Sequence, residues 1–218
     1  MTVQEFSNEF DILYNNIASN QAPGLDEYEK SVFLTRSQEE LVESLYNGNN
    51  IFGKSFEETE ELRRCLSNLI ITTELVENKR TYMGVSSNSK FYTLPEDLWF
   101  ITYESLKVGD KTIEVIPVSQ DNYHKIKNNP FKGASNKRAL RLDYDGDTVE
   151  IVCTESLVKY CIKYIVKPSP IILEDLSNSD LFINNSNTKS ECMLNTSLHR
   201  LILERAVQKA AASWSHNK

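Results

Sequence analysis

The stretch "LRLDYDGDTVEIV", residues 140–152, holds three aspartates at alternate positions around a glycine. A calcium loop of the EF-hand type needs acidic ligands at its first, third and fifth positions, glycine at the sixth and glutamate at the twelfth. Asp143, Asp145 and Asp147 meet the first requirement, but the glycine is Gly146 at the fourth position and the twelfth residue is a threonine. We therefore expect no metal site in this stretch.

The same residues fit a β-hairpin well. The dipeptide "DG" at 145–146 is a strong two-residue turn signal, because a type I′ turn needs positive φ at both central positions. A turn placed there puts Leu142 opposite Val149. It also puts Arg141 opposite Glu150, an opposite-charge cross-strand pair. The register then separates an apolar face from a polar face, so the three carboxylates point to different sides and cannot converge on one ion.

Composition and charge limit the possible functions. The chain has 218 residues, 40% of them hydrophobic and 25% charged, as expected of a globular protein. Its formal charge of −7 makes sequence-independent DNA binding a poor explanation, since that affinity depends on Lys and Arg. No apolar segment approaches the roughly 20 residues that cross a bilayer, and the N-terminus lacks a secretion signal, so we expect no membrane contact.

No catalytic or cofactor-binding pattern is recognisable, and we expect no enzyme activity and no cofactor. The four cysteines form no CxxC pair, and no histidine lies at a zinc-ligand spacing from them. We expect reduced, buried thiols, although one sequence leaves a Cys–His nucleophile open. The residues concerned are Cys65, Cys153, Cys161 and Cys192 with His124, His199 and His216.

The hydrophobic pattern predicts an α+β fold in three parts: helical residues 1–76, β-rich residues 80–173 with antiparallel strands, and a polar loop with a C-terminal helix over 174–218. Asp26 followed by Glu29 predicts the start of a second helix, and "NGNN" from Asn47 its end. A third helix is expected from Ser55, and a final one from about Thr196.

The β-rich part is expected to end in one long alternating strand, "LVKYCIKYIVKPSPIIL" from Leu157. Lys159, Lys163 and Lys167 share its polar face and form the obvious basic feature of the chain. A solvated strand edge explains such a row, and a face that contacts DNA or a partner is the alternative.

Four blocks of sequence resemble a known family, the head-to-tail ring proteins of crAss-like and related short-tailed phages of gut Bacteroidales. They are "FDILYNNIASNQAPGLDEYEKSVFLTRSQEELVESLYNG", "YTLPEDLWFITYE", "YCIKYIVKPSPIIL" and "LNTSLHRLILERAVQKA", starting at residues 10, 92, 160 and 194. Family members carry an acidic-Leu-Pro turn before the last helix where this chain has "ECMLNTSLH", which alters the loop and keeps the helix start.

The resemblance implies a structural adaptor that packs as a ring of about twelve copies below the portal of the capsid. Its partners would be other copies of itself, the portal protein, adjacent tail rings, and DNA that passes through the lumen without specific binding. It would be made in the host bacterial cytoplasm and reside in the neck or tail of the virion.

A ring subunit must expose apolar surface before it assembles, and two helices have more apolar residues than one face can hide. We expect subunit or portal contacts at Tyr28, Phe33, Leu45, Leu201, Leu203 and Trp214. The alternative is that both helices are buried within the subunit. For the function, the alternatives are a phage DNA-binding or packaging accessory protein that uses the lysine row, and a cysteine hydrolase.

Overall fold

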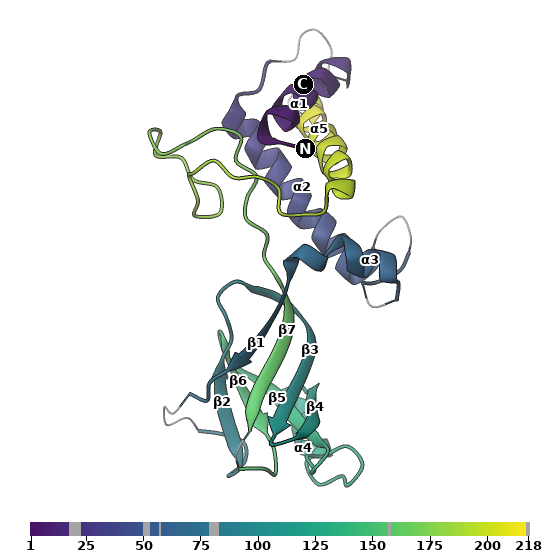
Figure 1. The fold of residues 1–218 in the computed structure, drawn as a ribbon, viewed down its shortest axis with the longest axis vertical. Coiled ribbons are helices and arrows are strands. Elements are labelled where there is room, and N and C mark those ends of the chain that lie inside the picture. The colour runs from purple at the N-terminus through teal and green to yellow at the C-terminus, as the bar shows by residue number, and fades with distance from the viewer. Residues whose placement is uncertain (18–22, 50–52, 57, 79–82, 157, 217–218) are drawn as a thin grey trace. The chain divides into compact units, whose positions relative to one another are not determined.

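The computed structural model describes residues 1–17, 23–49, 53–56, 58–78, 83–156 and 158–216, without the side chains of 215–216. The chain divides into two compact units. The helical unit comprises Met1–Leu69 with Lys167–Lys218, and the β unit comprises Ile70–Val166 (Figure 1). The β unit is thus inserted into the helical unit. Its first strand residue, Ile70, lies opposite Ile165, so the insertion begins and ends on neighbouring strands.

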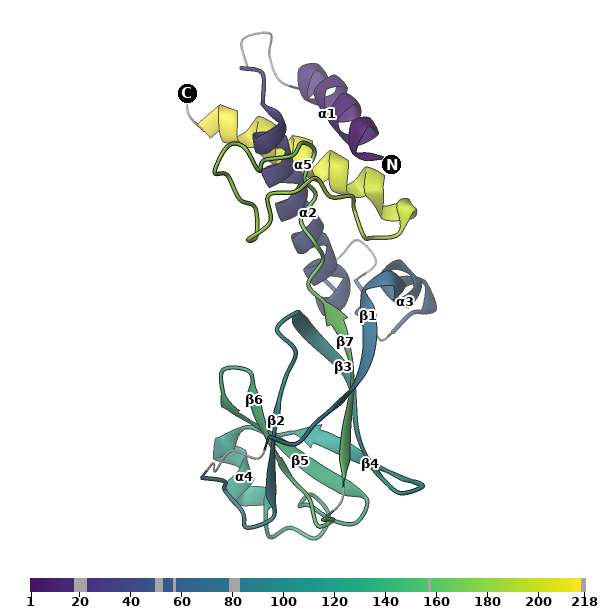
Figure 2. The ribbon, with the colours of Figure 1, turned by 60° about the vertical axis from the view of Figure 1, so that its left-hand side comes forward.

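The long helices in the described part of the helical unit are α1 (Val3–Ile17), α2 (Glu27–Asn47) and α5 (Thr196–His216), with α5 packed against both others (Figure 2). The predicted ends of α2 are confirmed. The Asp26 carboxylate accepts a hydrogen bond from the amide of Glu29, and the Glu29 carboxylate accepts one from the amide of Asp26. At the other end Gly48 has a φ of +80°, the left-handed geometry that terminates many helices.

The third helix differs from the prediction. The helix α3 spans only Glu60–Cys65 and is capped by Thr59, and after a 3₁₀ turn the strand β1 begins at Ile70. Ser55 and Glu58 do bond each other, because the Ser55 amide donates to the Glu58 carboxylate at 3.0 Å. That contact closes a local turn and does not start a helix.

Buried polar side chains on one face of α2 hold the chain that follows the β unit. Ser31, Thr35 and Gln38 recur at helical spacing and are at most 3% exposed. The Thr35 hydroxyl accepts a hydrogen bond from the amide of Ile171 at 3.0 Å and donates to its carbonyl at 3.3 Å. The Ser31 hydroxyl accepts a hydrogen bond at 3.0 Å from the amide two residues after Ile171. The Gln38 side chain donates one at 2.8 Å to the carbonyl two residues before Ile171. We call these three side chains the polar row.

The long strand predicted from Leu157 is therefore too long. Leu157 itself lies outside the described residues, and β7 spans only Lys159–Val166. Prolines at 168 and 170 lack the amide hydrogens that a sheet ladder requires. The apolar residues beyond them are buried within the helical unit, and the polar row supplies the hydrogen bonds that a neighbouring strand would have made.

Among the described residues of the β unit, seven strands form one mixed sheet, in the order β1-β7-β3-β4-β5-β6-β2. They are β1 (Ile70–Leu75), β2 (Ser89–Thr93), β3 (Leu98–Val108), β4 (Lys111–Pro117), β5 (Arg138–Asp145), β6 (Thr148–Val152) and β7. Beyond β1, Glu77 forms a bridge with Tyr92 of β2, which joins the two outer strands, so the sheet curls on itself (Figure 2). The prediction of an α+β fold is confirmed.

One detail of the predicted sheet is wrong: its strands are not all antiparallel. The strands β4 and β5 pair in parallel, with Val115 opposite Ala139. The short helix α4 (Gln120–Ile126) lies between them in the sequence, and this crossover returns the chain in the same direction. Ser119, whose backbone is extended, lies at the N-cap of α4.

The predicted hairpin is present, but its turn is displaced by one residue. Gly146 and Asp147 connect β5 to β6, and Gly146 has a φ of +49° at the first central position. The register shifts between Asp143 and Asp145, so Tyr144 is an extra residue in β5. Since positive φ occurs at the first central residue alone, the turn follows type II′ preferences and not type I′.

This shift removes the predicted pair between Arg141 and Glu150. Arg141 lies opposite Ile151 instead, and its guanidinium forms an ion pair with Glu104 at 3.1 Å. The hydroxyl of Tyr160 donates to the same carboxylate at 2.6 Å. Burial raises the pKa of Glu104, and the Tyr160 hydrogen bond and the Arg141 charge offset only part of that effect.

We expect the substitution Thr35→Val to release the returning segment, because it leaves the amide and carbonyl of Ile171 buried without partners. The free energy of unfolding of the helical unit should fall by about 2 kcal/mol, and hydrogen exchange at the Ile171 amide should accelerate. The matched control, Thr35→Ser, keeps the hydroxyl and should keep most of the protection. Equal exchange in the two variants would contradict the role given to the polar row.

Candidate subunit interface

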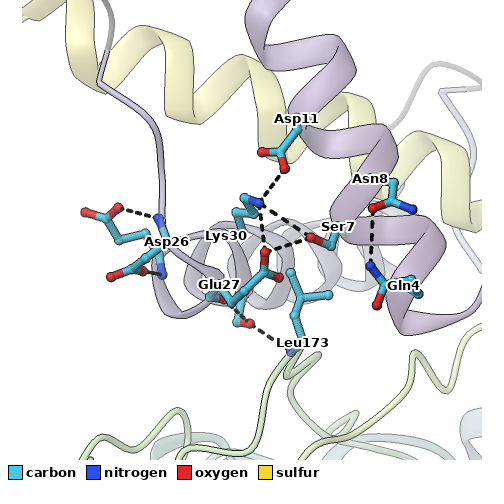
Figure 3. Close-up of polar contacts among 10 residues, drawn as sticks. Gln4, Ser7, Asn8, Asp11, Asp26, Glu27, Lys30 and Leu173 are labelled. Atoms are coloured by element: carbon cyan, nitrogen blue, oxygen red, sulfur yellow. Dashed lines mark hydrogen bonds and ion pairs between the residues drawn. The ribbon is translucent and has the colours of Figure 1, made fainter.

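A buried lysine joins α1 to α2 (Figure 3). The Lys30 ammonium, 4% exposed, lies 2.7 Å from the Asp11 carboxylate and 2.9 Å from that of Glu27. Ser7 of α1 donates to the same Glu27 carboxylate at 2.8 Å. Burial alone lowers the pKa of Lys30, but the hydrogen bonds and charges of the two carboxylates outweigh it and leave that pKa raised. The network fixes the inner face of α1, so its outer face remains available for contacts.

Only some of the residues predicted to contact other subunits lie at the surface. Leu45 and Leu203 are 2% and 0% exposed, so within this fold they belong to the core and offer no contact surface. The others are half-buried, and Tyr28 packs against a small cluster of Ile172 with Leu176 and Ile183 of the polar loop. The half-buried residues are Tyr28, Phe33, Leu201 and Trp214.

Several large apolar side chains outside the predicted contact residues are exposed. On α1, Ile12 and Ile17 are 61% and 57% exposed. In the β unit, Phe131 is 83% exposed in the loop after α4, and in the helical unit Phe182 is 57% exposed in the polar loop. Exposed residues of this size mark surfaces that a partner can cover. Ile12, Phe131 and Phe182 belong to no apolar stripe in the sequence, so periodicity does not reveal their exposure.

The predicted lysine row is largely neutralised within the chain. Lys159, Lys163 and Lys167 are all exposed, as expected. However, Lys159 lies 3.3 Å from the carboxylate of Glu74, and Lys167 lies 3.2 Å from that of Glu39. Neighbouring acids reduce the attraction of such lysines for phosphate, so the row is a weak candidate for a DNA-binding face.

A stronger basic feature was missed. Residues 127–138, which we call the basic loop, carry four basic side chains and no acidic one. Lys127, Lys132 and Lys137 are exposed, and none forms an ion pair with any described residue. The four charges are spread over twelve positions, so they form no run, and only a count of net charge in a window reveals them.

Comparison with known proteins decides the family. The sequence matches the family described as phage tail ring protein 3/4 along residues 1–218. It is 46% identical over 222 residues to Ring protein 3 of Bacteroides phage crAss001, covering 98% of this chain and 96% of that protein. The chain belongs to this tail ring protein family. It is also 38% identical over 223 residues to Ring protein 4/5 of the same phage, covering 98% and 94% of the two chains.

The family resemblance seen in the sequence is thereby confirmed, and it supports a structural role in a phage tail ring. Virion tail is the corresponding location, and the relatives are named as ring components and not as enzymes. No helix in the described part of the chain is long and apolar enough to cross a membrane. Among the described residues, no group of three or more His, Cys, Asp or Glu is placed to hold a metal ion.

The thiols of this ring protein are poorly suited to nucleophilic chemistry. Burial raises the pKa of each cysteine, and that of Cys192 to about 11. A thiol with such a pKa is protonated near neutral pH and therefore a weak nucleophile. His199 is buried, with its Nε2 bonded to the carbonyl of Leu194, while His124 is exposed and the side chain of His216 lies outside the described residues.

We expect Lys30→Met to lower the free energy of unfolding of the helical unit by about 2 kcal/mol near neutral pH, since both carboxylates lose their charged partner. Because the pKa of Lys30 is raised above its ordinary value of 10.5, its stabilising effect is complete below that pH. The effect is then lost as the pH rises through the folded-state pKa. Urea unfolding at several pH values should show that the difference in free energy of unfolding between wild type and variant becomes smaller above pH 10.5.

The matched control for this experiment is Arg36→Met, which removes an exposed cation from the same helix and should cost less than about 0.5 kcal/mol. The role of the buried lysine would be refuted if the difference in free energy of unfolding grew at alkaline pH. It would also be refuted if Arg36→Met lowered that free energy as much as Lys30→Met.

Proposed function

We propose that this chain forms a closed ring of about twelve identical copies in the phage neck, below the portal, and that DNA passes through its lumen during packaging and ejection. The full-length membership of the tail ring protein family is the observation that carries the proposal. The portal position, the copy number and the passage of DNA are the parts that extend beyond that membership.

The charge of the chain supports a conduit. Twelve copies with a formal charge of −7 each give a ring of about −84. An acidic lumen repels phosphates, so DNA slides through it without binding. The ion pairs of Lys159 and Lys167 favour this passive role over that of a DNA-binding packaging accessory.

Contacts with adjacent rings are part of the proposal. Bacteroides phage crAss001 has two different proteins, Ring protein 3 and Ring protein 4/5, that are similar to this chain along nearly its full length. We infer that one tail uses this fold more than once. A stack of homologous rings accounts for that repetition, with the half-buried residues Tyr28, Phe33, Leu201 and Trp214 available for contacts between subunits or with the portal.

Electron microscopy of purified virions tests the proposal directly. A focused reconstruction of the neck should show this fold in a ring of about twelve copies next to the portal, with a lumen wide enough for duplex DNA. The density should contain the closed β unit and the helices of the helical unit. A different position in the particle, an occluded lumen, or the absence of this chain from mature virions would refute the proposal.

A further inference from the structure

The basic loop is built to present one aromatic side chain. The side-chain oxygen of Asn129 accepts hydrogen bonds from the amides of Phe131 and Lys132 at 2.8 and 3.2 Å. The guanidinium of Arg138 donates to the carbonyl of Phe131. Gly133 is required for this turn, because a Cβ there would lie 2.9 Å from the carbonyl oxygen of Asn129. The loop is thus ordered by its own contacts before any partner binds, which reduces the entropy cost of binding.

The basic loop has the properties of a protein contact as well as of a charged surface. Phe131, 83% exposed, has no packing role in the β unit that would explain a large apolar residue there. Around it lie the exposed lysines that form no ion pair with described residues. Phosphate binding would use the lysines and leave the aromatic ring unexplained, whereas an acidic protein surface with an apolar centre uses both.

The chain itself carries a surface of that kind. Residues 1–69 contain thirteen acidic and five basic side chains. One face of α1 carries four exposed residues, which follow one another at intervals of four, three and four positions. They are Glu5, Glu9, Ile12 and Asn16. Ile12 is 61% exposed at the centre of this face, which we call the α1 stripe.

We propose that in the assembled ring the basic loop of one copy docks on the α1 stripe of the next copy, with Phe131 against Ile12 and the loop lysines beside Glu5 and Glu9. This inference rests on the proposed ring and names the contact that closes it. The two surfaces differ, as a head-to-tail contact between identical subunits requires. The opposite charges steer the encounter and set the direction of assembly, and the apolar centre supplies the affinity.

Charge reversal with mixing tests this contact. The loop variant, Lys132→Glu with Lys137→Glu, cancels the positive charge of the loop and places two acidic side chains against the acidic stripe. The stripe variant, Glu9→Lys with Asn16→Lys, makes the stripe basic, so that it repels the basic loop. It leaves the capping contacts of Glu5 intact. Each variant alone should require roughly tenfold more protein to self-associate in sedimentation experiments. An equimolar mixture should recover wild-type association, because every contact between the two variants is again complementary.

Matched controls have the same changes of charge at other exposed positions. Lys111→Glu with Lys163→Glu controls for the loop variant, and Glu43→Lys with Gln208→Lys controls for the stripe variant. Both controls should associate like the wild type. Failure of the mixture to recover association, or controls as defective as the variants, would overturn the proposal. Circular dichroism of every variant establishes that the fold is retained.

Cross-linking in virions decides the matter even if the isolated chain does not self-associate. A photoreactive phenylalanine analogue at position 131 should form a cross-link to residues 1–17 of another copy. Cross-links to DNA, or to a different virion protein only, would overturn the inference while leaving the proposed ring intact. If the chain is absent from the neck, the proposed function fails as well, and the two failures are therefore distinguishable.

Discussion

The hydrogen bonds between the polar row of α2 and the returning chain are the interaction on which the rest of the molecule depends. The helical unit is made of two segments separated by the whole β unit, and each must recognise the other. Apolar packing with α5 supplies much of the stability, but it is not directional. The paired bonds of Thr35 to both backbone groups of Ile171 fix which residue meets which. If the returning chain shifted along α2, the buried amide and carbonyl of Ile171 would lose their hydrogen-bond partners.

This arrangement is compatible with the two unlike surfaces that the proposed ring contact requires. The β unit leaves and re-enters the helical unit through the neighbouring strands β1 and β7, so it can close its own sheet. Its basic loop is braced locally by Asn129 and Arg138. The helical unit places most of the acidic surplus on a scaffold braced by Lys30. A ring subunit needs two unlike faces of this kind, and the inserted fold supplies them.

Much of this fold was predictable from the sequence where the signal is local. The capping pair at Asp26, the final helix, the α+β class and the hairpin were all found from short patterns. The hairpin register failed by one residue, because Gly146 alone does not reveal whether it is the first or second central residue of its turn. The polar row was missed because Ser, Thr and Gln on a helix normally indicate a solvated face, and only the returning segment buries Thr35. The basic loop was missed because its charges are dispersed, and exposure at Phe131 is a property of the folded chain.

The most direct test of the central claim is to remove the β unit and ask whether the two segments of the helical unit still recognise each other. Residues 70–166 would be replaced by a short Gly/Ser linker, which the neighbouring positions of Ile70 and Ile165 permit. We expect a helical, cooperatively folded protein in which the Ile171 amide is protected from hydrogen exchange, with that protection lost in the Thr35→Val background. A shortened chain that is unfolded, or folded with an unprotected Ile171 amide, would contradict it.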